Sequence, residues 1–297
     1  MLHFLPAFLR IFLAGLLIAA NTVLLTTPLL LVSLFKLALP FSFRRTCNRV
    51  LVWLAELWIA VNSGLIDLFT RTRFDVEGLH GLKPDGHYLV LANHRSWVDI
   101  AVLQKVFNRR IPLLRFFLKS QLIWIPFLGL AWWALDFPFM KRYSRKVLAR
   151  HPELAGKDVL STRRACEKFR GMPVSVMNFV EGTRFTAEKH ARQDSPYRHL
   201  LRPKAGGVAF VLNAMDSSLH SIIDVTIVYP NGTPTMLDLM ADRIGQVRVR
   251  IGERAIPAQF KGGDYENDKA FRVGFQRWLN GIWSEKDQQV SRLLGDG

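Results

Sequence analysis

A histidine and an aspartate with four residues between them form the pair with the clearest chemical potential in this sequence. They are His94 and Asp99, in the stretch ANHRSWVDI. An imidazole that donates a proton from one ring nitrogen to a carboxylate is held in one tautomer, and its other nitrogen can then act as a base. We therefore predict that Asp99 orients His94, which removes a proton from a hydroxyl group.

The spacing of His94 and Asp99 restricts where the two side chains can meet. A strand is expected over 88–92, and a helix is expected to begin near Ser96. In one continuous helix, residues five apart lie about 140° apart around the axis, too far for contact. His94 must therefore precede the helix, where its ring can fold back toward a carboxylate in the first turn. The letters SWVD also have the form of a capping box, so Asp99 could instead serve only to cap the helix.

A second polar segment follows another apolar run. The letters EGTRF come directly after PVSVMNFV, a buried strand by its pattern. Active-site residues gather at the carboxyl ends of strands in open α/β sheets, so we expect Glu181 and Arg184 near His94. Arg184 can bind a phosphate through two donors, and Glu181 can bind a hydroxyl group or orient Arg184. The alternative is a surface ion pair in a turn.

Further basic residues are candidates for binding an anion. The letters PKAGG place Lys204 and free backbone N–H groups at the start of an expected helix, a pattern that suits a phosphate. Lys141 and Arg142 end an aromatic-rich segment, and a solvated basic pair at a membrane face is the alternative for them. No nucleophile motif such as GxSxG occurs, so direct attack of a hydroxyl group on an activated carbonyl fits better than a covalent enzyme intermediate.

The elements that must hold these residues alternate from residue 71 onward. Short apolar or alternating runs predict strands, and helical spacing separates them. This order predicts an α/β fold with a mixed, mostly parallel sheet flanked by helices. The expected strands are 74–79, 87–92, 173–180, 224–230 and 245–253, and the expected helices are 97–107, 158–170, 204–215 and 268–294.

The composition indicates an anionic partner. Lys and Arg number 40 against 24 Asp and Glu, a net charge of +16. Such a balance suits phospholipid headgroups, a phosphorylated substrate, CoA, an acidic carrier protein or nucleic acid. The two cysteines, Cys47 and Cys166, belong to no CxxC motif and no Cys/His cluster, so the sequence predicts no metal site.

An apolar N-terminus predicts membrane attachment. No charged residue occurs from Ile11 to Phe35, a run of about 37 Å as a helix against a hydrocarbon core of about 30 Å. Because Pro28 lies inside the run, 11–39 could form a single span or a hairpin that enters one leaflet. More basic residues follow the run than precede it, which places the rest of the chain in the cytoplasm.

A second apolar stretch, 50–69, contains two tryptophans and two acidic residues. We predict an interfacial helix that lies along the membrane, and a core helix is the alternative. The chain is thereby divided into a membrane anchor over 1–70 and a cytoplasmic domain over 71–297.

Four sequence blocks together resemble the glycerolipid acyltransferase family of the 1-acylglycerol-3-phosphate acyltransferase type. NHRSWVD resembles the first block, N-H-x4-D, and FVEGTRF resembles the third. The second block has a Lys, a Pro-x-x-Gly and a final Arg, which here are Lys119, Pro126, Gly129 and Arg142, and IVYP resembles the fourth. The resemblance covers 75–230. Stretches such as WALDFPFMKRYSR are similar to the bacterial inner-membrane branch called YihG-type, although Lys141 stands where many members have an acidic residue.

The resemblance implies an enzyme with His94 and Asp99 as catalytic residues. It implies transfer of a fatty acyl group from acyl-CoA or acyl-carrier protein to the sn-2 hydroxyl of lysophosphatidic acid, giving phosphatidic acid. No metal or bound cofactor is implied, and membrane phospholipids are the expected surroundings, at the bacterial inner membrane. The residues expected to bind substrate are Lys119, Arg142, Glu181, Gly182, Thr183, Arg184 and Lys204.

Two other functions fit the sequence. The same chemistry could act on another lysophospholipid or lipid acceptor. A membrane-tethered protein that binds nucleic acid is less well supported, because the aromatic residues lie mainly in apolar runs. The tryptophans Trp124, Trp132 and Trp133 are candidate walls of a tunnel for an acyl chain.

Overall fold

The structure is a computed structural model that describes residues 2–140, 150, 172–215, 218–265 and 267–295. A six-stranded sheet forms its centre, in the order β1-β8-β7-β2-β6-β3. Neighbouring strands are parallel except β7 and β8, which confirms the predicted mixed, mostly parallel sheet. The strands are β1 Arg73–Glu77, β2 His87–Ala92, β3 Leu114–Phe116, β6 Val174–Phe179, β7 Ser221–Val228 and β8 Gln246–Arg254, with a separate pair of β4 Leu118–Lys119 and β5 Phe139–Met140.

Each expected strand is present within a few residues of its predicted bounds, but β3 was not predicted. Its three residues are too few to show a period of two. The central strands β2 and β7 are buried almost throughout because helices cover both faces of the sheet, which is why they read as continuous apolar runs. The helix expected over 158–170 lies outside the described residues.

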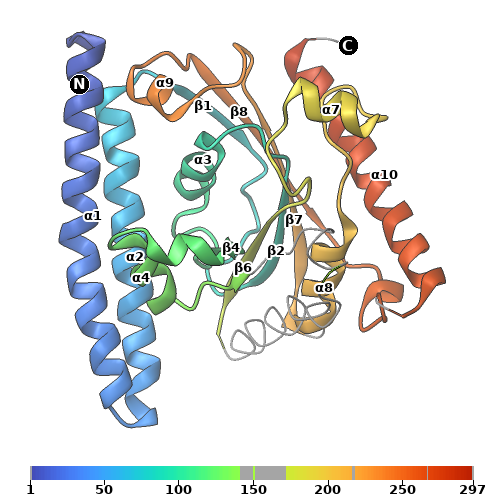
Figure 1. Cartoon of the computed structure of the whole chain (residues 1–297), viewed down its shortest axis with the longest axis horizontal. Coiled ribbons are helices and arrows are strands. Elements are labelled where there is room, and N and C mark those ends of the chain that lie inside the picture. Colours follow the sequence, from blue (N-terminus) through green and yellow to red (C-terminus); the bar gives the residue numbers. More distant parts are fainter. Residues whose placement is uncertain (1, 141–149, 151–171, 216–217, 266, 296–297) are drawn as a thin grey trace.

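Helices cover the two faces of the sheet separately (Figure 1). One face packs against α3 Val98–Phe107 and the N-terminal hairpin, and the other packs against α8 Ala205–Met215 and α10 Lys269–Leu294. Shorter helices complete the described part of the chain: η1 Leu2–Phe4, η2 Ser120–Trp124, α4 Leu128–Ala134, α7 Ala187–Gln193, α9 Met236–Met240 and η5 Ala258–Phe260.

The N-terminus forms a hairpin of two long helices, α1 Ala7–Ala38 and α2 Phe41–Phe69. Each is long and apolar enough to cross a membrane. Pro28 does not end α1, and the hydroxyl groups of Thr26 and Thr27 donate to carbonyls one turn back. The stretch 50–69 is part of a longer helix, and several of its side chains join the core. That it lies along a membrane stays a prediction.

The body of the protein packs along the hairpin rather than at one end of it (Figure 1). Near the start of α1, Arg10 pairs with Asp242 at 3.2 Å, and near its end Lys36 pairs with Asp136 at 3.3 Å. These two pairs are 26 residues apart on α1, or about 39 Å at about 1.5 Å per residue. Elements that follow the hairpin in the sequence therefore contact both ends of a membrane-length helix.

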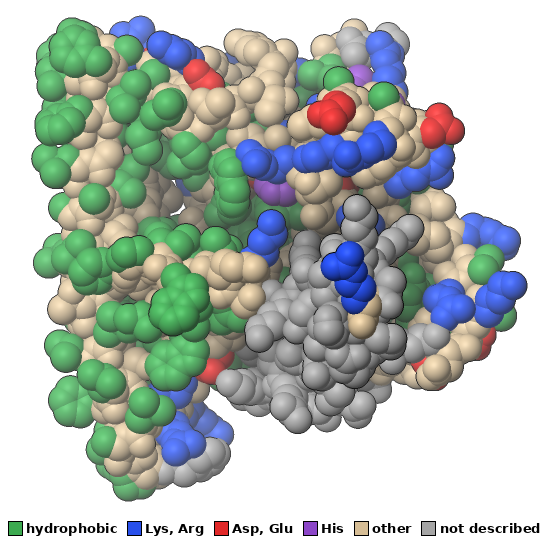
Figure 2. Space-filling view, viewed as in Figure 1, with side chains coloured by type: hydrophobic (Ala, Val, Ile, Leu, Met, Phe, Trp, Pro, Cys, Tyr) green, Lys and Arg blue, Asp and Glu red, His purple; other side chains and the backbone are tan. Residues whose placement is uncertain are grey.

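The outward face of α1 is apolar and uncovered. Figure 2 shows green side chains along the whole hairpin. A water-exposed helix would place polar residues there, so this face is suited to lipid. The side chains that are more than half exposed on this face are Phe8, Phe12, Leu16, Leu24, Leu31, Leu34, Phe35 and Leu37.

A fully buried lysine fastens α10 to the sheet. The ammonium group of Lys286 donates to the carbonyl oxygen of Val225 at 2.6 Å and to the hydroxyl of Thr226 at 3.2 Å, and lies 2.5 Å from the carboxylate of Asp224. Burial lowers the pKa of Lys286, and the charge of Asp224 opposes that shift. The carboxylate also pairs with Arg254 at 2.9 Å.

Removing this ammonium group should destabilise the fold strongly. We expect Lys286→Ala to lower the free energy of unfolding by about 3–5 kcal/mol, because it leaves a buried carboxylate with one partner fewer. Denaturant unfolding of the detergent-solubilised protein measures the change. The control is Lys269→Ala at the exposed start of α10, which should stay within about 0.5 kcal/mol of the parent. Equal losses in the two variants would contradict the role given to Lys286.

Candidate active site

The register of the sheet brings two polar loops to the same level. In the parallel pair β2 and β6, Ala92 lies opposite Phe179, and each is the last residue of its strand. His94 and Glu181 both follow two residues later. The backbone N–H of His94 donates to Oε1 of Glu181 at 3.1 Å. The expected proximity of these residues is therefore present.

His94 and Asp99 are in direct contact. Nδ1 of His94 lies 2.8 Å from Oδ2 of Asp99. The helix α3 begins at Val98, so His94 precedes it, as the spacing required. The Asp99 side chain is fully buried, whereas 12% of the His94 side chain is exposed.

Three further donors hold the Asp99 carboxylate. Its Oδ2 atom accepts from the backbone N–H groups of Arg95 at 2.7 Å and Ser96 at 2.9 Å. Its Oδ1 atom accepts from the hydroxyl of Tyr229 at 2.6 Å. The Ser96 hydroxyl accepts from the N–H of Val98 instead of completing a capping box. Asp99 thus binds the chain just before the helix and contacts His94 at the same time.

The imidazole ring of His94 is fixed on one side by stacking. It lies on the ring of Phe179 with centroids 3.8 Å apart and planes 13° apart. With a proton on Nδ1 directed at Asp99, Nε2 carries the free lone pair. Within the described part of the chain, Nε2 has no hydrogen-bond partner, so it is available to a substrate hydroxyl group.

Glu181 faces inward and joins two loops. Its second oxygen accepts from the N–H of Leu201 at 3.0 Å, and only 1% of the residue is exposed. Burial raises the pKa of Glu181 from 4.5 to about 7, although the donors at His94 and Leu201 oppose the shift. These contacts indicate that Glu181 positions the backbone of His94. They do not direct it toward Arg184, and binding of substrate by Glu181 stays a prediction.

Two arginine–aromatic contacts join the His94 loop to the Glu181 loop. The Arg95 guanidinium lies 4.3 Å from the ring centre of Phe185, and that of Arg184 lies 4.9 Å from the ring centre of Trp97. The N–H of Phe185 also donates to the carbonyl oxygen of His94 at 2.8 Å. Arg184 is exposed, and its guanidinium lies over the indole of Trp97, so its donors can face a ligand.

Lys204 reaches the same loop from the other side. Its backbone N–H donates to the carbonyl oxygen of Val180 at 2.9 Å. Gly182 has a φ of 69°, and a Cβ built on it would lie 3.0 Å from Nζ of Lys204. The absence of a side chain at Gly182 therefore leaves room for the lysine side chain. The hydroxyl of Thr183 accepts from Lys189 at 2.9 Å. The structure therefore gathers Gly182, Thr183, Arg184 and Lys204 beside the His94 loop.

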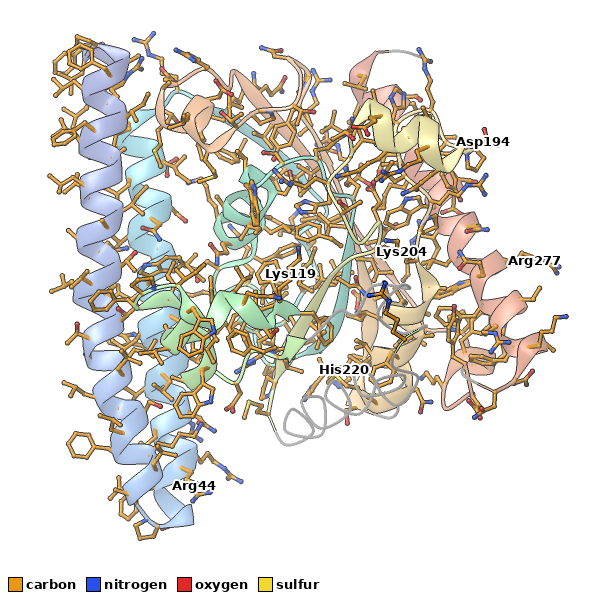
Figure 3. All side chains as sticks on the ribbon, viewed as in Figure 1. Arg44, Lys119, Asp194, Lys204, His220 and Arg277 are labelled. Carbon is orange, nitrogen blue, oxygen red and sulfur yellow. The ribbon has the colours of Figure 1, made fainter. Side chains whose placement is uncertain are left out.

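Two other predicted binding residues are placed differently. Lys119 is exposed on β4 and lies on the α4 side of the sheet, whereas Lys204 lies on the α8 side (Figure 3). Arg142 and its neighbour Lys141 lie outside the described residues. Their part in binding a substrate stays a prediction.

Tyr229 and Phe179, which contact Asp99 and His94, were not predicted as site residues. Both stand in blocks noted in the sequence, IVYP and FVEGTRF, but neither was given a role. A signal was present, because Tyr229 directly follows β7, the strand on the other side of β2, at the edge where His94 lies. Asn93 supports the same edge, since its amide exchanges two hydrogen bonds of 2.9 Å with the backbone of Ile227.

An apolar cavity of about 360 Å³ lies between the hairpin, α3 and α9. Its lining includes Trp58 of α2, Ile100 of α3 and Met236 of α9, and it reaches Trp97, the ring under Arg184. None of the three candidate tunnel walls lines this cavity. Trp124 and Trp133 are 85% and 48% exposed, and Trp132 lines a smaller cavity between the hairpin and α4.

The raised pKa of Glu181 predicts a pH-dependent stability. Between pH 4.5 and about 7 the folded protein binds more protons at this group than the unfolded chain does, so stability falls as pH rises. In Glu181→Gln we expect the free energy of unfolding to fall less steeply over this range, as measured by denaturant titration at pH 5, 6 and 7. Glu188→Gln, at an exposed site on α7, serves as the control. An unchanged slope in Glu181→Gln would show that another group titrates.

Comparison with known proteins places the chain in a family. Residues 73–230 match the Acyltransferase family. The chain is 25% identical over 286 residues to 1-acyl-sn-glycerol-3-phosphate acyltransferase 3 of Arabidopsis thaliana, covering 88% of this chain and 68% of that protein. It is 23% identical over 249 residues to 1-acyl-sn-glycerol-3-phosphate acyltransferase gamma of Mus musculus, covering 80% and 62%.

Other similar proteins differ in acceptor or in source. The 2-acyl-1-lysophosphatidylinositol acyltransferase of Saccharomyces cerevisiae is 24% identical over 221 residues, with 61% of this chain and 54% of that protein covered. The crystal structure of the 1-acyl-sn-glycerophosphate acyltransferase PlsC from Thermotoga maritima has a TM-score of 0.49 and 16% identity, covering 90% of this chain and 98% of that one. The chain spans between 54% and 68% of the length of the three curated relatives named here. Since the family match takes in more than half of its residues, this protein belongs to the Acyltransferase family.

Proposed function

We propose that this protein transfers a fatty acyl group from acyl-CoA or acyl-carrier protein to the sn-2 hydroxyl of 1-acylglycerol-3-phosphate, giving phosphatidic acid. The observation that carries the proposal is the contact of 2.8 Å between His94 and Asp99, with Nε2 of His94 open at the edge of the sheet. Relatives named for this acceptor support the choice of substrate. Family membership argues against the alternative of a nucleic-acid-binding protein.

The reaction needs one base and no covalent enzyme intermediate. Nε2 of His94 takes the proton of the acceptor hydroxyl as its oxygen attacks the thioester carbonyl carbon. The tetrahedral intermediate collapses with breakage of the C–S bond, and the imidazolium returns its proton to the leaving thiolate. Asp99 stabilises the imidazolium, and the hydrogen bonds from Tyr229, Arg95 and Ser96 keep that carboxylate in place.

The basic groups beside His94 suit the phosphate of the acceptor. Arg184 can offer two parallel donors, and Lys204 adds a point charge over Gly182. We assign the apolar cavity to an acyl chain, because its lining is hydrocarbon and it reaches Trp97 beside the phosphate site. Lys119 and Arg142 complete the proposed set of binding residues by analogy with the family.

We infer that the hairpin lies within one leaflet and does not cross the bilayer. Domain elements contact α1 near Arg10 and near Lys36, so a perpendicular span would carry one of these contacts through the membrane core. The uncovered apolar face of α1 would then contact lipid along its length. The catalytic domain would face the cytoplasm at the bacterial inner membrane, in keeping with the YihG-type stretches of the sequence.

A second acceptor has support of its own. One relative at 24% identity is named for lysophosphatidylinositol, so sequence similarity of this level does not separate acceptors. A panel of lysophospholipids with one labelled acyl-CoA decides between them. Product formed from another lysolipid, with none from lysophosphatidic acid, would overturn the proposed acceptor and leave the chemistry unchanged.

Removing the imidazole tests the proposed base. We expect His94→Ala to lower acyl transfer to lysophosphatidic acid by about 10²–10⁴-fold, the usual contribution of a general base. The assay uses the purified protein in vesicles with labelled acyl-CoA or acyl-carrier protein, and products are identified by mass. His80→Ala, at an exposed site, is the control. Activity near the parent level in His94→Ala would remove His94 from the chemistry.

Tyr229 should act through Asp99 rather than on the substrate. Tyr229→Phe leaves the buried Oδ1 of Asp99 without its donor, so the negative charge is more localised and holds the imidazolium more tightly. We expect kcat to fall about tenfold with little change in KM, and the acidic limb of the pH–rate profile to move to higher pH. Tyr197→Phe is the matched control, because its hydroxyl contacts Asn280 on α10. A uniform loss of rate at every pH would indicate damage to the fold instead.

A further inference from the structure

A group of large apolar side chains projects into solvent next to the hairpin. We call it the aromatic patch, and its members on η2, α4 and the turn between them are Trp124, Ile125, Phe127, Leu130 and Trp133. Trp124 is 85% exposed, and Leu130 and Trp133 are about half exposed. Figure 2 shows green side chains gathered where α4 meets the hairpin. A folded protein rarely leaves so much contiguous apolar surface to water without a partner for it.

The backbone holds the patch outward in a strained turn. Phe127 has a φ of 59°, in the left-handed region that a residue with a Cβ rarely adopts. A Cβ on Gly129 would lie 2.0 Å from the carbonyl oxygen of Ile123, so η2 and α4 are packed as closely as glycine permits. The exposed rings are therefore set on a tight, defined turn.

The patch continues the apolar face of α1. Helix α4 packs on α1, and Lys36 of α1 pairs with Asp136 just after α4. On α1 itself, the neighbouring residues Leu31, Leu34 and Phe35 are more than half exposed. One uncovered apolar surface thus runs from a membrane-length helix onto an element of the catalytic domain.

We propose that the aromatic patch inserts into the headgroup region of the bilayer and forms a second membrane contact beside the hairpin. Indole rings favour this region, because their apolar surface meets acyl chains while the N–H stays hydrated. Lys119, exposed just before η2, would face the phosphates of the lipids. Two contacts would fix the angle between the domain and the membrane. Because Leu128 of α4 lines the 360 Å³ cavity, the cavity would then be held against the lipid.

This inference rests on membrane attachment and not on the acyl acceptor, so it can be tested apart from catalysis. The full-length protein is placed in vesicles of phosphatidylethanolamine and phosphatidylglycerol, with or without brominated acyl chains, which quench tryptophan fluorescence at short range. The parent is compared with Trp124→Phe, Trp133→Phe and, as a control, Trp278→Phe. Trp278 is partly buried against the core on the far side of the sheet.

The difference between parent and variant isolates the signal of one tryptophan. We expect the signals of Trp124 and Trp133 to fall by at least half in brominated vesicles and that of Trp278 to be unchanged. Unquenched Trp124 and Trp133 would overturn the proposal. If, in addition, a double variant Trp124→Gln/Trp133→Gln changed the sedimentation of the protein, the patch would be an interface between protein chains.

A kinetic experiment separates membrane docking from damage to the fold. We expect Trp124→Gln/Trp133→Gln to raise the apparent KM for a long-chain lysophosphatidic acid in vesicles several-fold. Its rate with a short-chain acceptor dissolved below its micelle concentration should equal that of the parent. Equal losses with both acceptors would count against the proposal. An inactive parent would overturn the proposed function, and the quenching result would still decide the role of the patch.

Discussion

The carboxylate of Asp99 is fully buried, and a buried charge without water needs hydrogen-bond donors on every side. It obtains them from two parts of the chain: the ring of His94 and the backbone of Arg95 and Ser96, which follow β2, and the hydroxyl of Tyr229 after β7. The donors at His94, Arg95 and Ser96 lie within five residues of Asp99, whereas the Tyr229 hydroxyl reaches it only when β7 lies beside β2. The buried carboxylate therefore links the loop after β2 to the end of β7. From the sequence, Asp99 could either cap the helix or orient His94. In the fold, one carboxylate binds the backbone N–H groups just before the helix and contacts the His94 ring at the same time.

The topology of the sheet explains why this edge carries the chemistry. β2 is a central strand with parallel neighbours on both sides, β6 and β7. Parallel neighbours end at the same edge, so His94, Glu181 and Tyr229 each lie one or two residues past a strand end and converge. An antiparallel neighbour would have sent its carboxyl end to the opposite edge. His94 is thereby held from two sides, through its backbone by Glu181 and through its carboxylate partner by Tyr229.

Local pattern was sufficient for much of this arrangement. Apolar runs located the strands, and the spacing of His94 and Asp99 required the histidine to precede its helix. Local pattern could not predict the register of the strands in the sheet. The partner of Asp99 in Tyr229 is 130 residues away, and it is fixed by how β7 aligns with β2. Glu181 turns inward because the chain at Leu201 passes beside it, and Trp124 turns outward on a strained turn, neither of which shows in the composition of its segment.

An amphiphilic acceptor must place a phosphate, a hydroxyl group and a hydrocarbon chain in three different surroundings within a few ångströms. Trp97 lies where those surroundings meet. One face of its ring carries the guanidinium of Arg184, and the same residue lines the apolar cavity between α3 and the hairpin. His94 is three residues before it, on the same loop. A lysolipid that divides at Trp97, with its phosphate toward Arg184 and its chain toward the hairpin, presents the hydroxyl group between them to Nε2. Under the proposed function, the hairpin would serve catalysis as well as attachment, because it supplies one wall of the apolar cavity.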